Sequence, residues 1–532
     1  MQIRRVLLLL FVLNSILGAK DLPTPKSHFG FVPGTDRELF TYEELIRYLK
    51  VVDDASDRVV LREIGRSPEG RTMYVCFISA PENLVRLDEL RTINQQLAWN
   101  TNLDAARRTQ YLKDGRVFVL GTLSMHSGEV GPSQAAPLIV YEAATTDDPA
   151  RLAILAETVY MMVPNHNPDG MNMVVANYHK YKGTEFEGAN LPGIYHKYVG
   201  HDNNRDFVTL SQTDTKAIST ITSRDWMPQV MVEKHQMGST APRYFVPPMH
   251  DPIAENVDAE LWNWTWIFGS EIVRDMTSQG LKGVSQHNRF DDYWPGSTET
   301  SSWKGVISLL TEAASARVAS PLYVEPTELV GRGKGLSEYK ISINMTDPWP
   351  GGWWRLSDIV AYEVASTWSI LRTAAGHRRD LLAFRNDVSR RAVAQGQNQA
   401  PAYFIMSVSQ QHDAGELAGI VNLLHEHGVK VHRLSTDLII EDRTLQAGDV
   451  VVSLAQPYRA FIKEVMEAQR FPERHYTPGG KLIEPYDITS WSLPLHRGVT
   501  AWQVDRVNLT LDAACELIDS DVPFKLWDGL PP

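Results

Sequence analysis

Two apolar runs of the chain end in residues that can bind a metal, and this pattern restricts the fold more than any other feature. The run Val117–Leu123 has the character of a buried strand and is followed by His126 and Glu129. A second run, over residues 230–232, leads to His235. Imidazole nitrogens and carboxylate oxygens are zinc ligands, and open α/β sheets bind ligands at the carboxyl ends of their strands. We expect these two histidines and the glutamate to form one metal site there.

Strand-like runs alternate with helical patterns from about residue 41 onward, which is typical of an α/β protein. A helix is expected to begin near Gly131, since Pro132 is tolerated in a first helical turn. The sequence predicts a mixed, mostly parallel sheet flanked by helices. Its strands are expected at 58–64, 73–78, 117–123, 158–163, 230–235 and 306–311.

A second unit is expected towards the carboxyl end. Ser357 is a candidate cap for a long helix that ends near Ala375, and the basic, polar residues 376–399 have the composition of a connector. The alternating pattern then begins again over residues 400–532, which predicts a smaller α/β, flavodoxin-like domain. Its elements are expected as strand 402–408, helix 413–427, strands 429–434 and 449–454, and helix 459–470.

The amino-terminal residues 1–19 have the pattern of a secretory signal peptide. Arg4 and Arg5 precede a short apolar run, and Ala19 offers a small-residue cleavage site. The alternative is an uncleaved membrane anchor, although the apolar run is shorter than a bilayer span. We expect a secreted or periplasmic protein with no stable membrane insertion after cleavage.

Composition narrows the possible partners and the means of stabilisation. The formal net charge of −12 argues against nucleic acid and anionic membranes as partners. Only two cysteines, Cys76 and Cys515, are present, so stability is expected to come from a hydrophobic core and not from a disulfide framework.

Further motifs lie before and after the first histidine and glutamate, in a fixed order along the chain. With the ligand candidates, they resemble the zinc carboxypeptidase (carboxypeptidase A-like) family over roughly residues 41–375. The motifs are Gly65–Arg71, Pro164–Gly170, Asp202–Asp206, His235 and Leu310–Glu312. The resemblance implies one zinc ion per chain, held by His126, Glu129 and His235. It also implies a peptide or peptide-like substrate with a free C-terminal carboxylate.

The same resemblance assigns roles to other residues. Glu312 takes the family's general acid/base position, and its alternative role is to cap or salt-bridge the next helix. Asn204 and Arg205 match a clamp for the substrate carboxylate, because a guanidinium can donate two parallel hydrogen bonds to a carboxylate. A structural salt bridge is the alternative for Arg205. The family usually has asparagine where Asp206 stands.

Two further assignments depend on position alone. The family's second arginine, which stabilises the oxyanion, falls on Lys182, with Lys180 or a solvated surface lysine as alternatives. Tyr293 best fits the mobile tyrosine that closes over substrate, and an ordinary packed tyrosine is the alternative. The side-chain pocket is expected near residues 298–302, where Glu299 faces either the pocket or water.

Residues 400–532 resemble the class I glutamine amidotransferase-like domain that is appended to some bacterial carboxypeptidase-family proteins. Cys515 lacks the flanking glycines of a strand-to-helix elbow, so we expect this domain to be noncatalytic.

The sequence predicts a secreted zinc metallocarboxypeptidase that hydrolyses C-terminal peptide bonds. One alternative is a zinc amidase or peptidase that acts on cell-wall peptides or N-acyl amino acids. Another is a catalytically degenerate protein that only binds peptides.

Overall fold

The computed structural model describes residues 22–191, 202–331 and 333–522. The expected signal peptide and its cleavage site at Ala19 lie outside the described residues. Within these ranges, no helix is both long and apolar enough to span a bilayer.

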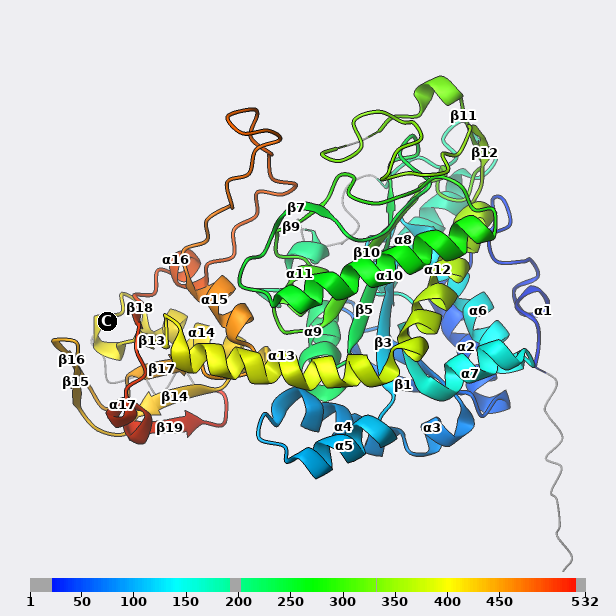
Figure 1. Ribbon diagram of the computed structural model, residues 1–532. Coiled ribbons are helices and arrows are strands. Elements are labelled where there is room, and N and C mark those ends of the chain that lie inside the picture. Colours follow the sequence, from blue (N-terminus) through cyan, green and yellow to red (C-terminus); the bar gives the residue numbers. More distant parts are fainter. Residues whose placement is uncertain (1–21, 192–201, 332, 523–532) are drawn as a thin grey trace, which may run out of the picture.

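An eight-stranded mixed sheet forms the centre of the larger part of the chain (Figure 1). From one edge to the other its strands are β1 (Val59–Arg66), β2 (Thr72–Ile78), β4 (Thr158–Val163), β3 (Val117–Leu123), β5 (Val230–Met237), β10 (Ile307–Ala314), β6 (Tyr244–Phe245) and β8 (Val284–Ser285). The four central strands β4, β3, β5 and β10 run parallel, whereas β1–β2, β2–β4 and β10–β6 are antiparallel pairs. The predicted mixed, mostly parallel sheet is therefore confirmed.

Helices flank this sheet, and α12 packs against both α6 and α10 (Figure 1). The helices are α1 (Pro25–Phe29), α2 (Tyr42–Ala55), α3 (Pro81–Val85), α4 (Leu87–Trp99), α5 (Ala105–Asp114), α6 (Val130–Thr145), α7 (Pro149–Glu157), α8 (Pro168–Tyr181), α9 (Thr213–Thr220), α10 (Ala259–Ser278), α11 (Ser297–Ser302) and α12 (Leu356–Gly376). The shorter elements are η1 (Asn203–Arg205), η2 (Ile221–Asp225), η3 (Pro326–Glu328), β7 (His250–Ile253), β9 (Asp291–Asp292), β11 (Leu322–Val324) and β12 (Gly352–Trp354). Helix α12 is capped at Arg355 and not at Ser357, because the Asp358 carboxylate accepts the Arg355 N–H.

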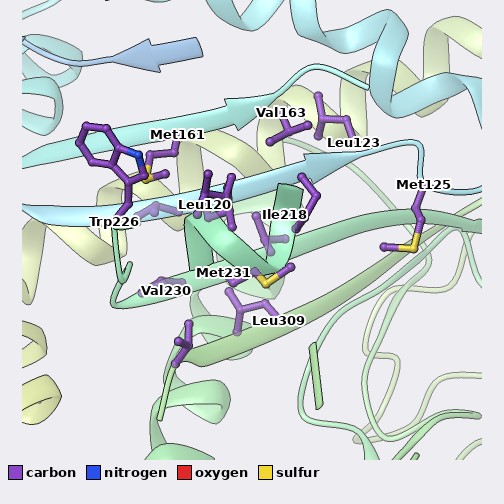
Figure 2. Close-up of a cluster of buried hydrophobic side chains, with 14 of the residues drawn as sticks. Leu120, Leu123, Met125, Met161, Val163, Ile218, Trp226, Val230, Met231 and Leu309 are labelled. Carbon is purple, nitrogen blue, oxygen red and sulfur yellow. The ribbon is translucent and has the colours of Figure 1, made fainter. Parts of the chain in front are cut away.

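The alternating side chains of β5 place Glu233 and His235 on the same face of the sheet. Successive side chains of a strand point to opposite faces. The Lys234 ammonium is buried and lies 2.8 Å from the Glu363 carboxylate of α12. Glu233 and His235 consequently face away from α12. In Figure 2, Met231 of the same strand lies in the apolar cluster that includes Leu120 and Ile218.

The carboxyl-terminal part contains a five-stranded sheet in the order β18-β13-β17-β14-β19. Its strands are β18 (Trp502–Val504), β13 (Tyr403–Met406), β17 (Val450–Ser453), β14 (Val431–Leu434) and β19 (Cys515–Ile518). All four strand pairs are antiparallel. A flavodoxin-like sheet is parallel, so the flavodoxin-like expectation was wrong in strand direction. Short apolar runs reveal that a strand exists, but they do not reveal which way it runs.

Helices and a hairpin surround this smaller sheet. They are η4 (Val408–Gln410), α14 (Ala414–Glu426), β15 (Leu438–Ile440), β16 (Arg443–Leu445), α15 (Arg459–Met466), α16 (Leu493–Arg497) and α17 (Leu509–Ala514). The expected connector forms a long helix, α13 (Arg378–Asn398), which packs against α4 and buries Leu381, Leu382 and Phe384.

The two parts of the chain share one hydrophobic core. The cluster of buried side chains that fills the larger part also includes Phe461 and Trp491. The Tyr458 hydroxyl donates a 2.6 Å hydrogen bond to the Ser223 carbonyl. Residues beyond 400 are thus part of the environment of the larger sheet.

Candidate metal and substrate site

Three predicted ligands converge at the carboxyl ends of β3 and β5, where His126 and Glu129 follow β3 and His235 lies near the end of β5. His126, Glu129 and His235 each offer one ligand atom, and these atoms lie within 4.8 Å of one another. The Nδ1 atom of each histidine lies 2.9 Å from a different oxygen of the Glu129 carboxylate. The turn that carries His126 and Glu129 is closed by a 2.9 Å hydrogen bond from the Glu129 N–H to the His126 carbonyl.

A second carboxylate supports each histidine from behind. The Nε2 atom of His126 lies 2.9 Å from Asp202, and that of His235 lies 3.2 Å from Glu233. A carboxylate that holds the Nε2–H leaves the Nδ1 lone pair for a metal, which is the usual support for zinc-bound histidine. The donor set therefore fits a zinc ion held by His126, Glu129 and His235.

The two histidines and their neighbouring carboxylates shift one another's pKa values. Burial lowers the pKa of His126, but Glu129 and Asp202 outweigh it and raise that pKa to about 10. Burial raises the pKa of Glu129, but the two histidines lower it to about 2. A bound cation would therefore compete with protons for the two imidazoles, whose pKa values are both raised by the neighbouring carboxylates.

Glu312 lies beside the ligand group. It pairs in register with His235, one strand across the sheet, and its side chain is buried. Burial raises the pKa of its carboxyl, and the neighbouring His235 acts in the opposite direction. A buried carboxyl with a raised pKa can both accept and return a proton near neutral pH.

Asn204 and Arg205 occupy different environments. Buried Asn204 donates to Glu233 over 3.2 Å and accepts the Ser297 N–H over 3.0 Å, which ties η1 to β5 and α11. The Arg205 guanidinium lies over the Trp294 ring at 4.2 Å. Its Nε donates a 3.0 Å hydrogen bond to Asp487, a residue of the carboxyl-terminal part.

The structure does not bring Lys182 or Tyr293 to the ligand group. Lys182 Nζ lies 2.8 Å from the Glu38 carboxylate at the surface. The Tyr293 hydroxyl donates to the Arg470 carbonyl over 2.7 Å, and its ring packs against Trp491. These contacts match the alternatives of a surface lysine and a packed tyrosine. Glu299 is buried, which excludes the alternative in which it faces water.

Other motif residues have structural roles. The buried Asp169 carboxylate pairs with Arg71 at 2.7 Å and accepts the Ser67 hydroxyl at 2.7 Å, so it joins two of the motifs. Asp206 accepts the backbone N–H groups of Ser211 and Gln212, each at 2.9 Å. Asp206, the residue expected to be asparagine, therefore caps a turn with its carboxylate.

Sequence reasoning missed four residues around the site. Glu233 could have been found, because it stands two positions before His235 and so shares its strand face. Asp202 was noted only as part of a motif. Tyr486 and Asp487 gave no local signal, because Asp487 is 282 residues away from its partner Arg205.

A family comparison adds to this geometry. Residues 45–235 match the zinc carboxypeptidase family. The match contains His126 and Glu129 and ends at His235, while Glu312 lies beyond it. It supports a zinc-dependent peptide hydrolase as the broad class of this protein.

Solved metallocarboxypeptidases resemble the chain only distantly. The metallo-carboxypeptidase from Burkholderia cenocepacia is 15% identical, with 63% of this chain and 69% of that chain covered at a TM-score of 0.41. Carboxypeptidase A from Helicoverpa armigera is 13% identical, with 65% and 74% covered at a TM-score of 0.40. No curated protein matches the sequence.

Proposed function

We propose that this protein is a secreted zinc metallocarboxypeptidase that hydrolyses C-terminal peptide bonds. One observation carries the proposal. Two histidines, each supported by a carboxylate, contact different oxygens of Glu129, and Glu312 is in register with His235 on the adjoining strand. The arrangement provides metal ligands and a proton acceptor at one point.

The roles of the side chains follow from these contacts. A bound zinc ion would supply an acidified water and polarise the scissile carbonyl. Glu312 accepts a proton from the attacking water and returns it to the leaving amine nitrogen, because it is the buried carboxyl next to the ligands. Asp202 and Glu233 hold the imidazole rings in one orientation.

Recognition of the substrate end is assigned to Arg205. The Arg205 side chain is about 15% exposed. Arg205 follows Asn204 in the sequence, and Asn204 donates a hydrogen bond to Glu233 on β5, the strand that carries His235. A guanidinium suits a carboxylate because both groups are planar and match in spacing. In this proposal the substrate carboxylate binds here and sets which peptide bond reaches Glu312.

The carboxyl-terminal part is assigned a noncatalytic role, and its amidotransferase-like resemblance stays a prediction. Burial and the neighbouring Asp512 raise the pKa of the Cys515 thiol to about 11. A thiol with such a pKa is almost entirely protonated at neutral pH and is a poor nucleophile. Export remains part of the proposal on the strength of the signal-like residues 1–19.

Amino-acid release from a mixed peptide library tests the function. The zinc-loaded protein should release free C-terminal amino acids, and both chelation and Glu312→Gln should abolish the release. Lys182→Met is the matched control and should keep full activity, because Lys182 pairs with Glu38 at the surface. A wild type that binds zinc stoichiometrically but releases no amino acid would contradict the proposal.

A further inference from the structure

The carboxyl-terminal part places a carboxylate on the arginine that the proposed function assigns to substrate. Asp487 Oδ2 accepts the Arg205 Nε–H over 3.0 Å, and Asp487 Oδ1 accepts the Thr489 N–H over 2.7 Å. We infer that Asp487 is a specificity-determining residue, which competes with the substrate's terminal carboxylate for Arg205. This inference rests on the proposed carboxypeptidase function.

The segment that carries Asp487 is firmly held. The Tyr486 N–H donates a 2.8 Å hydrogen bond to the buried Asp291 carboxylate. The Tyr486 ring contacts Phe290 and Trp294, with centroid distances of 4.9 Å and 5.5 Å. Because Trp294 also lies under the Arg205 guanidinium, one aromatic surface positions both partners of the ion pair.

The hydrogen-bonding capacity of Arg205 explains why Asp487 competes. An Nε atom carries a single hydrogen, so a second carboxylate cannot use the Nε side of the guanidinium while Asp487 is bound. Nη1 also donates to the Asn204 carbonyl over 2.9 Å. A substrate carboxylate can make two parallel hydrogen bonds on the Nε side only after Asp487 has moved away.

Charge acts in the same direction. The carboxylates of Asp202 and Asp487 lie 3.9 Å and 3.0 Å from the guanidinium, so its positive charge is already balanced. Asp487 and Arg205 are only 19% and 15% exposed, which limits screening by solvent. A third carboxylate is repelled unless it replaces Asp487. The wild-type site should therefore distinguish weakly between a terminal carboxylate and a neutral terminal amide.

The test measures binding of N-acetyl-L-phenylalanine and its neutral amide to the full-length protein by calorimetry. Asp487→Asn removes the competing charge and should tighten binding of the acid by about tenfold, while binding of the amide stays unchanged. Glu484→Gln is the matched control. It removes a charge from the same segment at an exposed residue that pairs with Lys481, so both affinities should stay at the wild-type values.

Acid binding that is unchanged or weakened in Asp487→Asn would overturn the inference, as would a failure of wild type and variant to bind the acid at all. Thermal unfolding checks that the variant folds, and Asp487→Ser replaces it if it does not. Peptide hydrolysis separates the two proposals. If wild type cleaves peptides and Asp487→Asn binds the acid no better, the inference alone fails. If Asp487→Asn binds the acid tenfold better but neither protein cleaves peptides, the proposed function alone fails.

Discussion

Lys304 provides a sharp test of how the two parts of the chain fit together. Its ammonium is buried and donates 2.8 Å hydrogen bonds to the Ser223 hydroxyl and to His427 Nδ1. His427 Nε2 lies 2.9 Å from the Val208 carbonyl, so this histidine carries its proton on Nε2 and accepts through Nδ1. Burial lowers the pKa of Lys304 from 10.5 to about 7.

The direction of the pH effect follows from proton binding. Between pH 7 and pH 10.5 the unfolded chain holds a proton on Lys304 that the folded chain has released. The free energy of unfolding therefore rises with pH across this window, by up to about 1.4 kcal/mol per pH unit. Between pH 7 and pH 9.5 the wild type should gain about 3 kcal/mol from this residue.

Lys304→Met removes that pH dependence. It also leaves the Ser223 hydroxyl and His427 Nδ1 without their Lys304 partner, at a cost of about 1–3 kcal/mol for each group. At pH 7 this cost opposes the relief of a buried charge, so the two proteins should be similar in stability. At pH 9.5 the wild type should be more stable by roughly 3 kcal/mol beyond any difference at pH 7.

Urea unfolding at a series of pH values measures this difference. Lys216→Met is the matched control, because Lys216 also joins the two parts but pairs with Glu426 at 44% exposure. Its pH profile should follow that of the wild type between pH 7 and pH 9.5. Parallel profiles for wild type and Lys304→Met would show that Lys304 does not lose its proton on folding in this pH range.

Three further predictions concern the metal site and a motif contact. Zinc uptake at pH 7 should release about two protons, because the pKa values of His126 and His235 are raised in the metal-free site, and calorimetry in buffers of different ionisation enthalpy counts them. Release of no protons would contradict this. Asp202→Asn should weaken zinc binding by about tenfold to a hundredfold in a chelator competition, and an unchanged affinity would show that Asp202 does not support His126. Asp169→Ala should lower the free energy of unfolding by about 3 kcal/mol, because Arg71 loses a buried partner, whereas a loss below about 1 kcal/mol would reduce this contact to an ordinary surface pair.

The larger sheet could be predicted because its buried strands appear in the sequence as runs of mostly apolar residues. Runs such as Val117–Leu123 are mostly apolar and buried at every residue, since strands in a parallel sheet are covered on both faces. The smaller sheet was harder to predict from the sequence, because the direction of a strand depends on how the strands are connected and not on how apolar they are. Its strands β13 and β17, for example, pair antiparallel although helix α14 and other strands lie between them in the sequence.

The candidate ligands could be predicted for a related reason. Strands β3 and β5 are parallel neighbours, so residues just beyond or near their carboxyl ends meet without help from the rest of the chain. The surroundings of Arg205 and Tyr293 depend instead on Asp487 and Arg470, which are brought in by tertiary packing. Lys182 could not be placed either, because it follows the end of α8, where its direction is set by the ion pair with Glu38.

We propose that one zinc ion is held by His126, Glu129 and His235. Anomalous diffraction at the zinc edge from crystals of the zinc-loaded protein tests it most directly. We expect one strong peak bonded to Nδ1 of both histidines and to the Glu129 carboxylate. A protein that takes up zinc at another group of residues, with no peak between these three side chains, would contradict it.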